Sequence, residues 1–243
     1  MALPIITIMK HDLTLPSSGE KVVYRPFLVK EEKILMMSLQ SGDPKDMVRG
    51  LKQIINNCMD QDLKVDTLPP FDLEYIFLQL RARSVGDVIS INYSIAEEKC
   101  KDGKKECEFA IELNIDDVKV QKNKNHKDLI ELTDKIKLKM KYPSMEASAT
   151  MAGVEGIDVV NKTFNIIGQC IEYILDGEEM YKLSDYSKEE SDTFLDSLST
   201  QHFKEIQSFF DTMPKLKHEI TSTCTVCGKE NERVLEGMGD FFS

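Results

Sequence analysis

The chain has no tryptophan and no apolar run long enough to cross a membrane. A membrane-spanning helix needs about 18 or more consecutive apolar residues, and because no such run occurs we expect no membrane span. Residues 1–10 contain neither a basic segment nor a long apolar core, so we expect no secretory signal. Without export the surroundings are reducing. The six cysteines are then expected to be core side chains, reactive thiols or metal ligands, not disulfides.

The familiar catalytic motifs are also absent. The sequence contains no GxxxxGK[ST] phosphate loop, no GxGxxG, no GxSxG and no HExxH, which excludes the enzyme classes that depend on them. The four histidines are scattered, and none stands at a diagnostic spacing from a serine, cysteine or carboxylate. We therefore predict no catalytic residue and no enzymatic activity. An enzyme of unrecognised type remains the third alternative, without a nameable group of residues.

Acidic residues outnumber basic ones, 42 to 31. The formal net charge is -11 and the pI is about 5.0, a balance that repels phosphate backbones, so nucleic acid is not an expected partner. Lysines gather in one stretch, with eight lysines against three acidic residues between Lys119 and Lys141. The stretch from Glu172 to Asp196 is acidic, with nine acidic residues against two lysines. These stretches are either two solvated faces or complementary surfaces that join copies or partners, which leaves an oligomer open.

The hydrophobic pattern predicts an α+β fold, with antiparallel β-hairpins packed against helices. Apolar residues recur at helical spacing in some segments and alternate with polar residues in others. The predicted helices cover residues 31–40, 44–58, 72–83, 157–174 and 187–213. The predicted strands cover residues 5–15, 21–28, 88–95, 108–115, 136–141, 216–223 and 230–235.

The length fits one α+β domain over residues 1–243. It can be divided into an N-terminal hairpin with helices (1–86), a β-rich part (87–143 with 214–243) and a helical part (144–213).

Four cysteines lie at the ends of predicted hairpins. Cys224 and Cys227 form a CxxCG knuckle between two candidate strands, and Cys100 and Cys107 flank the tip of the other antiparallel pair. A tight turn aims two thiolates at one point, and two such hairpins would complete a tetrahedral, zinc-ribbon-like site for a structural Zn²⁺. Six residues separate Cys100 from Cys107, more than the two to four usual in a knuckle. Free thiols and a redox CxxC pair therefore remain alternatives, whereas Cys58 and Cys170 are assigned to the core.

The C-terminal Phe241 and Phe242 form an aromatic pair in a polar tail. Such a pair either folds back onto its own core or docks into another subunit, so both residues are candidate partner-binding residues.

Several segments resemble the baseplate hub subunit family of T-even-like bacteriophages (myoviruses). The resemblance is carried by residues 13–35, by residues 68–87 with their Leu-Pro-Pro-Phe-Asp start, and by the strand 138–143 that ends in Lys-Tyr-Pro. It continues through the knuckle at 224–228 to the Asp-Phe-Phe at 240–242. It thus spans nearly the whole chain, and its motifs are structural rather than catalytic.

The resemblance implies a protein made in the host cytoplasm that helps to build the hub of the tail baseplate. It would be a hub subunit, retained in the virion tail, or an assembly chaperone. Its partners would be other hub and tail proteins, including the tape-measure protein. The alternative from a different class is a zinc-ribbon module associated with nucleic acid, which would need a continuous basic face between Lys119 and Lys141.

Overall fold

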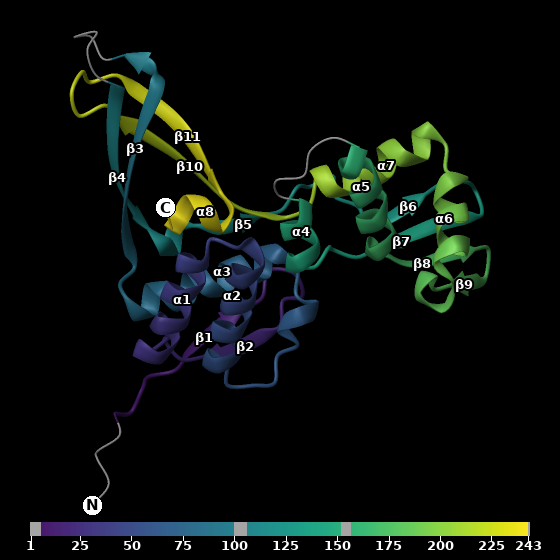
Figure 1. Ribbon diagram of the computed structural model, residues 1–243, viewed down its shortest axis with the longest axis horizontal. Coiled ribbons are helices and arrows are strands. Elements are labelled where there is room, and N and C mark those ends of the chain that lie inside the picture. Colours follow the sequence, from purple (N-terminus) through teal and green to yellow (C-terminus); the bar gives the residue numbers. More distant parts are fainter. Residues whose placement is uncertain (1–5, 100–105, 152–156, 243) are drawn as a thin grey trace, which may run out of the picture. The chain divides into compact units, whose positions relative to one another are not determined.

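The computed structural model describes residues 6–99, 106–151 and 157–242, and it confirms the α+β class (Figure 1). Within these residues the chain forms two compact units. Unit 1 is drawn from residues 1–65, 71–121 and 215–243, and unit 2 from residues 66–70 and 122–214. In the described part of the chain no helix has the length and apolarity needed to cross a bilayer.

Unit 1 begins with a short hairpin and a group of helices. Strands β1 (His11–Thr14) and β2 (Lys21–Tyr24) pair antiparallel, and are followed by α1 (Val29–Ser41), α2 (Pro44–Cys58) and α3 (Pro70–Ser84). The boundary between α1 and α2 follows from local chemistry. Gly42 adopts a left-handed φ of 67° that ends α1, and the Asp43 side chain accepts the Lys45 N–H at 2.8 Å to cap α2.

The second part of unit 1 consists of two β-structures that share a core. Strands β3 (Val88–Lys99) and β4 (Glu106–Asn114) form a long hairpin. Strands β10 (Lys215–Thr223) and β11 (Glu230–Glu236) form another, and β10 also pairs with β5 (Lys119–Gln121). Apolar residues of both β-structures, of α3 and of α8 (Gly237–Phe242) make one buried cluster. It contains Leu78, Ala82, Ile89, Ile91, Leu113, Ile115, Val118, Leu216, Ile220, Leu235 and Phe241.

Unit 2 is a four-stranded antiparallel sheet with helices. The strand order is β6 (Leu129–Glu131), β7 (Ile136–Met140), β8 (Ile171–Asp176) and β9 (Glu179–Tyr181). The helices are α4 (Met145–Met151), α5 (Ile157–Cys170), α6 (Lys188–Asp196) and α7 (Thr200–Asp211). Leu138, Cys170 and Ile206, all at 0% exposure, bring β7, α5 and α7 into one core.

Two helix predictions in unit 2 were too long. The helix predicted over 157–174 ends at Cys170, because Ile171 to Asp176 pairs with β7 as strand β8. A short segment of β-branched and aromatic residues is compatible with both a helix and a strand. Here the hydrogen bonds with β7 stabilise the strand. The predicted helix over 187–213 is two helices, since a second serine cap at Ser199 starts α7. The predicted capping box of Ser187 and Glu190 is confirmed.

A buried carboxylate secures the start of α1. Glu31 is fully buried, and its carboxylate accepts hydrogen bonds from Arg25 Nη2 at 3.0 Å and from the Leu28 N–H at 2.9 Å. Burial raises the pKa of Glu31, but these two donors outweigh burial, and the net pKa lies below its ordinary value of 4.5. The stabilisation is therefore present above the unfolded-state pKa and is lost as the pH falls through the folded-state pKa.

We predict that Glu31→Gln lowers the free energy of unfolding by about 2 kcal/mol at neutral pH, because it leaves Arg25 without its charged partner. Urea unfolding followed by circular dichroism measures this in a chain without tryptophan. The control is Glu236→Gln in the same unit, which breaks the exposed Lys215–Glu236 pair and should cost less than about 0.5 kcal/mol. Equal losses in the two variants would contradict the prediction.

Candidate metal centre

Three of the four predicted cysteines meet at the tips of the two long hairpins of unit 1. The Sγ atoms of Cys107, Cys224 and Cys227 all lie within 4.8 Å of one another, and those of Cys107 and Cys227 are 3.7 Å apart. Cys107 is on β4, whereas the other two belong to the β10–β11 turn. Figure 1 shows the two hairpins side by side with these tips at the same end. Cys100 lies outside the described residues, so its part as a fourth ligand stays a prediction.

The two-residue period of the strands brings these sulfurs together. On β4, Cys107 shares a face with the buried Phe109 and Leu113. At the end of β10, Cys224 continues the face of the buried Ile220 and Ser222. Because alternate side chains of a strand point to one side, both thiols turn into the space between the hairpins. Cys107 is 0% and Cys224 is 3% exposed.

The turn that carries Cys224 and Cys227 is closed by backbone hydrogen bonds. The Cys224 N–H donates to the Lys229 carbonyl at 2.8 Å, and the Gly228 N–H donates to the Cys224 carbonyl at 3.0 Å. Gly228 has a φ of 72°, in the left-handed region that side chains disfavour. The Thr225 N–H reaches the Glu108 carbonyl of β4 at 3.0 Å, so the knuckle is tied directly to the other hairpin.

The surroundings of Cys224 favour a thiolate. Burial raises the pKa of Cys224, but hydrogen bonds to its sulfur from the backbone N–H groups of Cys227, Val226 and Glu108 and from the Cys227 side chain outweigh burial. The resulting pKa is about 6. Thiolates are the form of cysteine that binds metal ions. The arrangement can thus supply three sulfur ligands from two hairpins.

An aromatic network beneath the cysteines was not predicted from the sequence. Tyr93 stacks on Phe109 with ring centroids 4.9 Å apart, and its hydroxyl lies 2.7 Å from Ser222 Oγ and 3.0 Å from Asn231 Oδ1. The guanidinium of Arg233 lies 4.7 Å from the Tyr93 ring centroid. The alternation of β3 could have indicated that Tyr93 faces inward. Its partners on β10 and β11 lie about 130 positions away, beyond the reach of local patterns.

The two other described cysteines are buried core residues. Cys58 and Cys170 are buried, as predicted, and burial raises their pKa to about 11 and about 12. Phe241 is 3% exposed and packs in the core of unit 1, which is the fold-back alternative for this residue. The side chain of Phe242 lies outside the described part of the chain.

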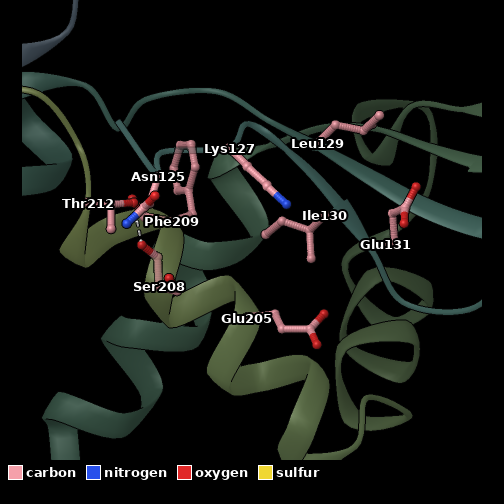
Figure 2. Close-up of a pocket in the computed structure, with 9 residues that line it drawn as sticks. All are labelled: Asn125, Lys127, Leu129, Ile130, Glu131, Glu205, Ser208, Phe209 and Thr212. Atoms are coloured by element: carbon pink, nitrogen blue, oxygen red, sulfur yellow. Dashed lines mark hydrogen bonds between the residues drawn. The ribbon is translucent and has the colours of Figure 1, made fainter. Parts of the chain in front are cut away.

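Unit 2 has a separate hollow of about 560 Å³ between β6 and α7. Figure 2 shows Lys127 and Ile130 directed into it, with Glu205 of α7 across from them. Its lining also includes Glu131 and Ser208 but neither a cysteine nor a histidine. Nothing in this lining matches a nucleophile with its base.

Two lysines of the lysine-rich stretch form ion pairs with nearby acidic residues. Lys137 pairs with Glu131 and Lys139 pairs with Asp128, both within unit 2. The acidic residues interspersed among the lysines therefore neutralise part of the charge locally, which weakens the alternative of a nucleic-acid module.

We predict that Gly228→Ala lowers the free energy of unfolding by about 1 kcal/mol, because alanine resists a positive φ. An added Cβ would meet nothing within 4 Å, so the cost is conformational rather than steric. Asparagine tolerates this region better, and Gly228→Asn should lose less. Urea unfolding of both variants tests this, and an alanine variant as stable as the parent would contradict the strained turn.

One comparison with known protein families gives a match that covers nearly the whole chain. A family model described as T4 bacteriophage base plate protein matches residues 8–243. No curated protein and no solved structure matches the chain. The match includes both hairpin tips and both compact units, and it confirms the resemblance at the level of the baseplate. The chain therefore belongs to the T4 bacteriophage base plate protein family.

Proposed function

We propose that this baseplate protein is a hub subunit or a hub assembly chaperone that works by binding other tail proteins and catalyses no reaction. The observation that carries the proposal is the family match over residues 8–243, which joins the whole described fold to the phage baseplate. The partners would be other hub and tail proteins, including the tape-measure protein. The protein would act in the host cytoplasm during assembly and, as a hub subunit, would remain in the virion.

Helix α1 offers a surface suited to such binding. It packs against α2 and buries Glu31, yet several of its large apolar side chains are exposed. Val29 is 67%, Met36 55%, Met37 70% and Leu39 53% exposed. Exposed apolar side chains gathered on one element are typical of protein-binding surfaces, and methionine adapts readily to a partner. The exposed surface of α1 therefore supports a role in protein binding.

Affinity purification tests the proposal, and analysis of mature particles distinguishes a hub subunit from an assembly chaperone. The tagged full chain, recovered from cells in which its phage assembles, should enrich baseplate hub or tail proteins when analysed by mass spectrometry. A hub subunit should also be found in purified mature particles, whereas a chaperone should be absent from them. If no baseplate or tail protein is enriched and the chain is missing from particles, the proposal is wrong.

We predict that the double variant Met36→Asp with Met37→Asp reduces the recovery of the bound tail proteins by about tenfold or more, because two carboxylates would have to be desolvated at the interface. Both residues are exposed, so the free energy of unfolding should change by no more than about 0.5 kcal/mol. The matched control is Met180→Asp on β9, where the side chain is 57% exposed. Equal recovery of tail proteins with the unaltered chain, the double variant and the control would exclude α1 as the binding surface.

A further inference from the structure

We propose that Cys107, Cys224 and Cys227 bind one structural Zn²⁺ ion, which joins the tip of the β3–β4 hairpin to the β10–β11 turn. The proposal concerns the stability of unit 1 and does not depend on which tail protein the chain binds.

The spacing of the sulfurs fits a tetrahedral ion. With Zn–S bonds of about 2.3 Å, two sulfurs of a tetrahedral site stand about 3.8 Å apart. The Cys107 and Cys227 sulfurs are 3.7 Å apart, and the third sulfur lies within 4.8 Å of both. A disulfide would need about 2.05 Å. The three thiols therefore surround a point at which a metal ion can sit.

The donor set selects the metal and its role. Sulfur ligands favour zinc, Cu(I) or iron over the hard cations that prefer oxygen. Cys107 and Cys224 are buried, and backbone N–H groups bond to the Cys224 sulfur. Such bonds to sulfur orient a ligand and stabilise its thiolate charge. Cys227 is partly exposed, and a donor set made only of sulfur is typical of structural zinc sites.

A metal ion would add to the few interactions that hold the hairpin tips together. The apolar cluster at the tips is small, with Cys107, Phe109 and Cys224 buried and Tyr93, Ile95 and Cys227 partly buried around them. A two-stranded hairpin is marginally stable without further packing. Cys107 and Cys227 are 120 positions apart in the sequence, so an ion that binds both would join distant segments of the chain. It would act beside the Thr225–Glu108 hydrogen bond and the Tyr93 contacts.

Metal analysis of the full chain tests the proposal. Protein purified through a tag without histidines, and without chelator, should contain about one zinc ion per chain by plasma mass spectrometry. Cys107→Ser and Cys224→Ser should each lower the zinc content by about tenfold or more. The control Cys170→Ala removes a buried thiol of unit 2 and should keep its zinc. Wild-type protein without zinc, or with iron in its place, overturns the proposal.

A second measurement does not depend on how well the variants fold. Wild-type protein reconstituted with Co²⁺ should show the intense near-ultraviolet absorption of thiolate-to-cobalt charge transfer, and added Zn²⁺ should abolish it. Zinc should also raise the thermal midpoint of the metal-free wild type, since an ion that binds the folded state alone stabilises it. Absence of the charge-transfer band overturns the proposal even if the serine variants fail to fold.

Discussion

The packing of the β3–β4 hairpin against the β5–β10–β11 sheet is the interaction on which unit 1 depends. Segments separated by about a hundred residues supply its two sides, and Leu113 of β4, Leu216 of β10 and Leu235 of β11 meet in one buried cluster with α3 and α8. The same alternation that buries these leucines continues outward to Cys107 and Cys224. The three thiols thus lie at the outer end of this apolar core. A metal ion bound there would stabilise unit 1 further through coordination bonds.

Much of the fold follows from local chemistry. The Asp43 cap, the Ser187 and Glu190 capping box and the alternation of β3 and β4 predict elements that the structure confirms. One exception was the isoleucine-rich end of α5, where the sequence fits both a helix and a strand and pairing with β7 stabilises the strand. The second serine cap, at Ser199, lay inside a continuous apolar pattern and was passed over for that reason. Local patterns predict helices and strands, whereas long-range hydrogen bonds determine which of the two an ambiguous segment forms.

The candidate site could be predicted in part. The CxxCG spacing indicated a knuckle, and the expected proximity of Cys107 agrees with its 3.7 Å distance from Cys227. The support from Tyr93, Ser222 and Arg233 could not be predicted, because it depends on the register of β3 against β10 and β11. The predicted division of the chain into one domain with three parts stays a prediction. Such a division depends on long-range contacts, which the composition does not encode. At the C-terminus, Phe241 completes the core of unit 1.

We propose that this baseplate protein binds partners through α1 and that sulfur ligands join its hairpin tips. The central claim is that a metal ion lies among Cys107, Cys224 and Cys227. An anomalous difference map from crystals of the full chain, measured on both sides of the zinc absorption edge, tests this most directly. The account predicts a single zinc peak about 2.3 Å from each of the three sulfurs. A map without such a peak, or a disulfide between Cys107 and Cys227, would contradict it.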